Sequence, residues 1–148
     1  MTLAPNSELV TVAWLRGVPG IDPSQVSTSR PQDNSTWAGS GFVQVGPMSG
    51  QPDVYIPMRR PVASVHLWAV NLNSGKPPWA KAAALGEAIL ADCQTHEPRD
   101  VSDQLPAQYR GARVLSAYAM GEPRRVPGDL TSYAHFVFDL QLHWCEVP

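Results

Sequence analysis

Cysteine is scarce in this 148-residue chain, which contains only Cys93 and Cys145. Two thiols cannot make a disulfide framework, and we expect both to be reduced in a cytosolic protein. Cys93 and His96 have a spacing typical of metal ligands, but no second pair completes a four-ligand site. We therefore interpret Cys93 as a buried helix residue and His96 as an exposed loop residue, and we predict no structural metal.

Long apolar runs and an excess of one charge are also missing. No run approaches the roughly 18 apolar residues of a membrane span, and the first six residues lack the pattern of a signal peptide. The formal charge of −2 and the hydrophobic content of 43% exclude a disordered chain and a strongly basic nucleic-acid-binding domain. We expect one compact domain over residues 1–148, soluble and made in the cytosol.

The common catalytic motifs are absent from the sequence. It contains no G-x-S-x-G, P-loop, H-E-x-x-H or C-x-x-C motif, and its four histidines are scattered along the chain. Asp139 and His143 fall on one face of an expected strand, but roughly 13 Å apart, too far for a hydrogen bond. One alternative stays open: a small enzyme or ligand-binding domain that uses His66 or His143 with an arginine pair as an anion clamp.

The strongest pattern that is present lies near the end of the chain, at residues 133–146. Apolar side chains occupy every second position and polar ones lie between them: Phe136, Phe138, Leu140, Leu142 and Trp144. This period predicts a half-buried β-strand. At about 3.3 Å per residue the strand would be roughly 45 Å long, so we expect it inside a sheet, either bent or extending toward a neighbour.

The remaining elements predict an α+β fold. Helices are expected at residues 7–16, capped by Asn6 or Ser7, and from residues 76–79 to about 94. Strands are expected at residues 25–28, 41–45, 54–57, 61–70 and 112–120. The second and third of these would form a hairpin with a long tip, and the fourth, apolar on both faces, a central strand covered on both sides. The order indicates a mostly antiparallel sheet with two helices packed on it.

Two arginine pairs are candidates for an interaction surface. Arg59 and Arg60 precede a proline and Arg124 and Arg125 follow one, so both pairs lie at strand ends where the backbone is stiff. Their guanidinium groups are suited to binding carboxylates or phosphates. Two ordinary solvated pairs are an equally good interpretation of the sequence, because exposed single charges contribute little.

Five tryptophans are many for a chain of this length, and tryptophan is enriched in protein interfaces. We assign Trp68 and Trp144 to the core, because they lie in the strongest strands. Trp37, in a loop, and Trp79, at a helix start, are assigned to an interface together with Asp53 of the expected hairpin tip.

Several stretches resemble the tail terminator proteins of long-tailed (siphovirus) actinobacterial phages. They follow in the expected order and cover most of the chain: VAWLRGVPG (12–20), PDVYIPMRRPV (52–62), WAVN (68–71) with KPPWAKA (76–82), GARVLSAY (111–118), and EPRRVPGD (122–129) leading into residues 132–144. The segments 30–34 and 97–108 depart from the pattern. Six ordered stretches are much more specific than any one of them.

The resemblance implies an α+β subunit of a homohexameric ring in the virion, at the head–tail interface. Such a ring caps the tail tube, stops its polymerisation and joins it to the head connector or stopper protein. It implies no catalysis and no cofactor, and genomic DNA passes through the lumen without sequence-specific binding. A slightly acidic chain agrees with a lumen that must not grip DNA. Another head–tail interface protein, a connector or stopper, is the alternative that sequence patterning does not separate from a terminator.

Overall fold

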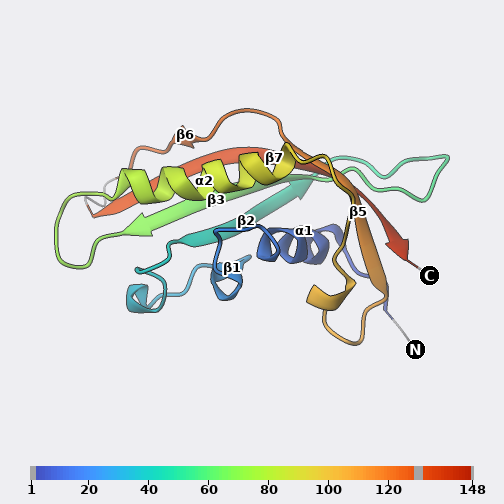
Figure 1. Cartoon of the computed structure of the whole chain (residues 1–148), viewed down its shortest axis with the longest axis horizontal. Helices are drawn as coiled ribbons and strands as arrows, with labels where there is room; N and C mark the ends of the chain where they lie inside the picture. The colour runs from blue at the N-terminus through green and yellow to red at the C-terminus, as the bar shows by residue number, and fades with distance from the viewer. Residues whose placement is uncertain (1–2, 129–131, 148) are drawn as a thin grey trace.

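Strand β7 (Tyr133–Val147) lies in the middle of the sheet of this computed structural model, which describes residues 3–128 and 132–147 (Figure 1). Strand β3 (Val62–Val70) pairs with it on one side and β5 (Gly111–Ala119) on the other, both antiparallel. The prediction of a long strand inside a sheet is therefore confirmed. Asp129, at the end of the connection at 122–129, and Met1 and Thr2 lie outside the described residues.

The sheet has the order β1-β2-β3-β7-β5-β4. Its outer strands are β1 (Val26–Ser27), β2 (Phe42–Ser49) and β4 (Arg99–Asp100). Among the described strands, only β1 and β2 pair in parallel. The short strand β6 (Arg124–Arg125), which the sequence did not predict, pairs with β7 beyond the end of β5. The described residues also form three short 3-10 helices: η1 (Pro23–Gln25), η2 (Asn34–Thr36) and η3 (Ser102–Gln104).

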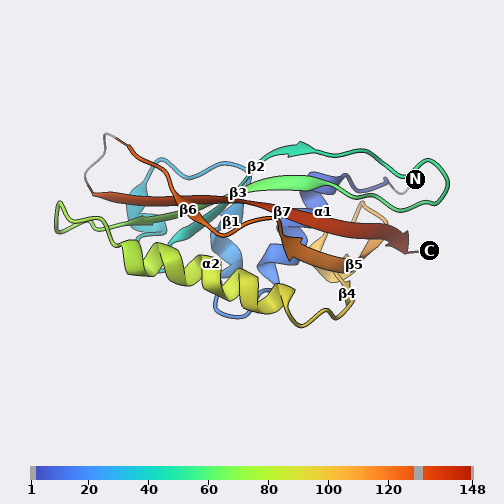
Figure 2. The same cartoon turned by 90° about the horizontal axis from the view of Figure 1, so that it is seen from above.

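Both helices cover one face of the sheet. Helix α1 (Ser7–Arg16) begins where the Asn6 side chain accepts a hydrogen bond from the Leu9 N–H at 2.8 Å, as the capping residue predicts. Helix α2 (Trp79–Cys93) runs along β3 and β7 (Figure 2). Their apolar sides form one buried cluster with the predicted apolar face of β7, including Phe138 and Trp144. The α+β class with two helices on a mostly antiparallel sheet is thereby confirmed.

The opposite face, which we call the open face, is only half-buried over much of its area. It is formed by polar and aromatic side chains of three strands: Gln44 of β2, Ser64, His66 and Trp68 of β3, and His135, Asp139, Gln141 and His143 of β7. The expectation that β3 is covered on both sides was therefore wrong for most of its length. Alternation of apolar residues reports the strand period, but only the tertiary packing decides whether a second layer exists.

The predicted strand at 54–57 was also wrong, because β2 pairs directly with β3 and the segment between them is a loop. The Asp53 carboxylate accepts the N–H groups of Tyr55 and Ile56 at 2.9 and 3.1 Å. This turn diverts the backbone from a sheet ladder. Residues 3–128 and 132–147 hold no helix long and apolar enough to cross a membrane.

Candidate interaction surfaces

Arg59 and Arg60 lie where the chain enters β3 and point to opposite faces. The backbone of Arg59 exchanges two hydrogen bonds with Trp144, of 2.8 and 3.0 Å, and its guanidinium lies 5.2 Å from the centre of the Trp144 ring. Arg60 forms an ion pair with Asp53 at 3.4 Å. Arg60 is the next residue along the strand, so its side chain belongs to the opposite face, the open face, beside His143. The pKa of His143 is lowered by burial and then by this guanidinium.

Arg124 and Arg125 form β6 and divide in the same way. Arg125 pairs with Phe136 and places its guanidinium 4.4 Å from the centre of the Trp79 ring, on the helix-covered face. Arg124 pairs with Val137 and so belongs to the open face. Because successive strand residues point to opposite sides of a sheet, each arginine pair supplies one cation to each face. The sequence placed Arg59 and Arg60 correctly at a strand end, whereas Arg124 and Arg125 form a short strand themselves, and the division between the two faces was not predicted.

Aromatic rings and imidazoles stack on the open face around Trp68. The His135 ring lies parallel to Trp68 at 3.7 Å between centroids, and the Arg30 guanidinium lies 4.1 Å from the Trp68 centroid. His135 Nε2 is 2.8 Å from Nδ1 of His66, so one ring donates and the other accepts. Burial, His66 and Arg30 lower the pKa of His135 to about 4, while burial and Arg124 lower that of His66. Both shifts favour the neutral form of the rings.

The structure reverses two of the four tryptophan assignments, those of Trp68 and Trp37. Trp144 is buried in the main core, as expected, but Trp68 is partly exposed on the open face. Trp37, assigned to an interface, is 0% exposed and packs with Phe42 under the loop that precedes β2. We therefore leave Trp37 out of any interface. Trp79 is partly exposed and contacts Phe136 edge-to-face, with Arg125 over its ring.

The loop between β2 and β3, residues 50–61, projects past one end of the sheet (Figure 1). Its tip exposes three consecutive apolar side chains, Val54 at 87%, Tyr55 at 94% and Ile56 at 50%. The base of this 50–61 loop is held by Asp53, through the turn described above and its ion pair with Arg60. The sequence indicated a long loop tip here but centred it on residues 46–53. The apolar run was read as a strand instead.

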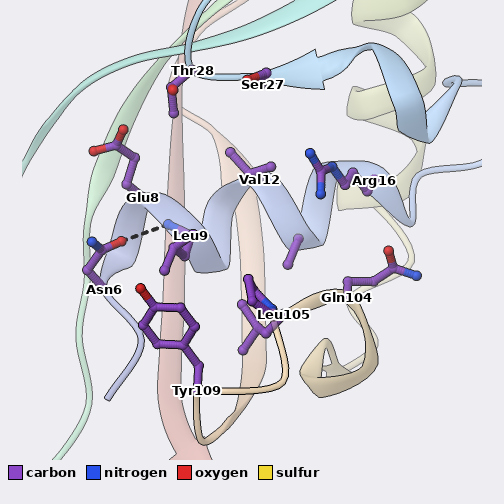
Figure 3. Close-up of a pocket in the computed structure, with 12 residues that line it drawn as sticks. Asn6, Glu8, Leu9, Val12, Arg16, Ser27, Thr28, Gln104, Leu105 and Tyr109 are labelled. Carbon is purple, nitrogen blue, oxygen red and sulfur yellow. Dashed lines mark hydrogen bonds between the residues drawn. The ribbon is translucent and has the colours of Figure 1, made fainter. Parts of the chain in front are cut away.

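A second feature, which the sequence did not reveal, is a pocket beside α1 with a volume of about 430 Å³. Helix α1 contributes Leu9 and Val12; Leu105 and Tyr109, from the segment after η3, lie on the side of Leu9, and Ser27 and Thr28 lie on the side of Val12 (Figure 3). We call it the α1 pocket. Arg16 lies at its far end, where Nη2 donates to the Val26 carbonyl at 3.1 Å. The buried Nε of Arg16 has no hydrogen-bond partner among the described residues.

The candidate catalytic groups do not assemble into a reactive site. Ser116 Oγ lies 2.9 Å from Nδ1 of His143, yet both face outward from the sheet. Cys93 is buried and His96 exposed, as predicted, and no three metal-binding side chains lie together within residues 3–128 and 132–147. A Ser–His pair without an orienting third group or a cleft lacks the arrangement of a hydrolase.

No protein-family model matches this chain, and no curated protein matches its sequence. A solved structure described as "Virion of native gene transfer agent (GTA) particle" contains a chain of similar shape. The TM-score is 0.49 at 11% sequence identity, and the alignment covers 96% of this chain and 87% of the other. A likeness of this size carries no weight for function, which must be argued from the chain itself.

Proposed function

We propose that this chain is a structural protein of a phage virion, the tail terminator. It forms a homohexameric ring on the last ring of the tail tube, stops tube growth and binds the head connector or stopper protein. The six ordered stretches of sequence similarity support this role. The structural observation that carries it is the 50–61 loop, which holds Val54, Tyr55 and Ile56 in water at the end of the sheet. Contiguous exposed apolar residues on a fixed loop are typical of a protein-binding site.

The two-faced arrangement of charges suits a subunit that contacts several partners. A ring requires that one surface of each subunit bind a different surface of the next. Arg60 and Arg124 on the open face, and Arg59 and Arg125 on the other, can pair with carboxylates of neighbouring subunits, of the tube or of the connector. Trp79 and Asp53 belong to the same surfaces through their contacts with Arg125 and Arg60. The net charge of −2 suits a ring that lets DNA pass.

Cryo-electron microscopy of intact particles tests the proposal directly. We expect six copies of this chain in one ring between the end of the tail tube and the head. A position one ring further toward the head would identify a connector or stopper instead. Particles in which the chain occurs as isolated monomers, or in another symmetry, would contradict the proposal.

Charge reversal tests the arginines. Arg124→Glu with Arg125→Glu is expected to leave circular dichroism and Tm nearly unchanged, because neither side chain is in the core, while tails become over-long or fail to join heads. Each lost charge-assisted contact costs roughly 1–2 kcal/mol and is repeated in every subunit of the ring.

The division of the pairs allows a sharper experiment. Arg60→Glu with Arg124→Glu alters only the open face, and Arg59→Glu with Arg125→Glu only the helix-covered face, so each reports on one partner surface. Lys76→Glu, in an exposed loop, is the control for a simple change of net charge. Normal tails and infectivity from both double variants would show that the arginines are merely solvated.

A small anion-binding domain is the second candidate, because Arg60 lies beside His143, whose ring also contacts the Ser116 hydroxyl. If the chain is such a domain, inorganic phosphate at millimolar concentration should raise Tm by several degrees, and Arg60→Gln should remove the effect. Under the terminator proposal phosphate leaves Tm unchanged.

A further inference from the structure

The tip of the 50–61 loop is a preformed apolar projection. Tyr55 is the most exposed large hydrophobic residue described, at 94%, and it lies between Val54 and Ile56. Two backbone N–H groups of the tip are tied to the Asp53 carboxylate, and the Met58 carbonyl accepts the Asp53 N–H at 3.1 Å. A tip whose backbone is already fixed loses little conformational entropy when it is bound. The tip of the loop is therefore suited to binding another surface.

The α1 pocket has the complementary chemistry. Leu9, Val12 and Leu105 supply its apolar lining, with Leu9 on the side of α1 toward Leu105 and Tyr109 (Figure 3). Its volume of about 430 Å³ lies in the range of roughly 300–1,000 Å³ found for ligand sites. The lining also includes polar side chains, among them Asn6 and Gln104. A pocket with both kinds of lining suits a group that is apolar along its length and polar at its end.

A tyrosine side chain is such a group, with an apolar ring and a hydroxyl that accepts a hydrogen bond. We propose that Tyr55 of one copy inserts into the α1 pocket of the next copy, with its ring against Leu9 and Leu105 and its hydroxyl among the polar groups that line the pocket. Charge complementarity favours a second copy of this chain as the occupant. Glu8 is an exposed carboxylate lining the pocket, and Arg59 an exposed guanidinium at the base of the inserted loop.

The contact is heterologous, because projection and pocket are different surfaces of one chain, and its repetition generates a ring or a filament. An aromatic side chain buries about 150–250 Å² and the pocket loses a similar area, so the contact buries on the order of 400 Å². This is about a third of the lower limit of roughly 1,200 Å² for a stable interface. One contact therefore does not hold a dimer, and closure, which gives each subunit two contacts, favours a ring. The inference thus rests on the ring of the proposed function and specifies how its subunits join.

Complementary variants test the contact in the full-length chain. Tyr55→Asp removes the projection and leaves the pocket intact, whereas Leu9→Trp fills the pocket and leaves the projection intact. We expect each variant alone to stay monomeric in mass photometry at concentrations where the wild-type chain forms rings, with unchanged circular dichroism. Tyr55→Phe keeps the ring but loses the hydroxyl, and should need about tenfold more protein to assemble. Leu72→Asp, at another exposed loop residue, is the control and should assemble normally.

Photo-cross-linking identifies the contact itself. With p-benzoylphenylalanine at position 55, we expect cross-links between copies that map to peptides containing Leu9 and Val12 or Leu105 and Tyr109. In a mixture of the two variants, the only open contact joins the projection of Leu9→Trp to the pocket of Tyr55→Asp. With the cross-linker at position 55 of Leu9→Trp, irradiation should therefore trap dimers that contain one chain of each variant.

Rings in which position 55 cross-links to the tube protein, or to other parts of the neighbouring copy, would overturn the inference while leaving the terminator proposal in place. Cross-links into the pocket from a chain found elsewhere in the virion would uphold the contact and refute the terminator proposal. Rings formed normally by Tyr55→Asp would also overturn the inference.

Discussion

Acidification should destabilise this protein through the histidine pair on the open face. In the folded chain the pKa of His135 is lowered from 6.5 to about 4, first by burial, then by His66, then by Arg30. The groups that face it are His66 from β3 and Arg30 from the loop before η2, and Arg124 from β6 acts on His66. Below pH 6.5 His135 takes up a proton in the unfolded chain, whereas in the folded chain it stays neutral until the pH approaches 4. Stability is therefore full above pH 6.5 and is lost as the pH falls toward 4.

The size of the effect follows from the pKa. Each pKa unit corresponds to about 1.4 kcal/mol, so the change from 6.5 to about 4 sets an upper value of about 3 kcal/mol. The ring is only half-buried, and solvent screening reduces the expected loss to about 1–2 kcal/mol. The carboxyl groups act in another range. The pKa of Asp53, for example, is lowered by the N–H of Tyr55 and then of Ile56, so its contribution is lost only as the pH falls below about 4.

Urea unfolding at pH 7.5, 6.5, 5.5 and 4.5 measures this loss. The wild-type free energy of unfolding should fall by about 1–2 kcal/mol between pH 6.5 and 4.5, and His135→Gln should remove most of that fall, whatever the cost of the lost stack on Trp68 at pH 7.5. His96→Asn is the matched control, because His96 is exposed and its positive φ of 56° is tolerated by asparagine. An unchanged pH dependence in His135→Gln would refute the reasoning.

Four further predictions concern the fold. Arg99→Ala removes an ion pair with Asp92 at 2.6 Å and should lower the free energy of unfolding in urea by about 1–3 kcal/mol; a loss below about 0.5 kcal/mol would mean that the pair is only a solvated contact. Gly41→Ala should cost about 1–3 kcal/mol, since Gly41 has φ +78° and an added Cβ would lie 2.8 Å from Leu85 Cδ1; wild-type stability would disprove the close approach. Burial raises the pKa of Cys93 to about 11, so iodoacetamide at pH 8 should alkylate it at least tenfold faster in urea than in buffer. Chelator or reductant should leave Tm unchanged, and a large drop would show a structural metal or disulfide.

Local patterns allowed much of the fold to be predicted. The two-residue period of β7, the Asn6 cap of α1 and the apolar stripe of α2 depend on residues within a few positions of one another, and all three elements formed where expected. Alternation also fixes which side of β7 is buried, because only one side is apolar. The class of the fold followed from the order of these elements.

The interaction surfaces depended on partners distant in sequence. Trp37 is buried because Phe42 lies beneath its loop, and Trp68 is partly exposed because neither helix covers that face. The run at 54–57 has the composition of a strand but meets no strand partner, since β2 pairs with β3.

The division of each arginine pair and the α1 pocket were likewise decided by the tertiary structure. Pairing with β7 sets which face Arg59 and Arg124 belong to, and the pocket joins α1 to a segment about 90 residues later in the chain. The sequence by itself determined the elements and the buried side of the central strand, because these follow from periods and caps a few residues long. Burial, pairing and cavities depend on which distant segments meet, and only the tertiary structure decided them.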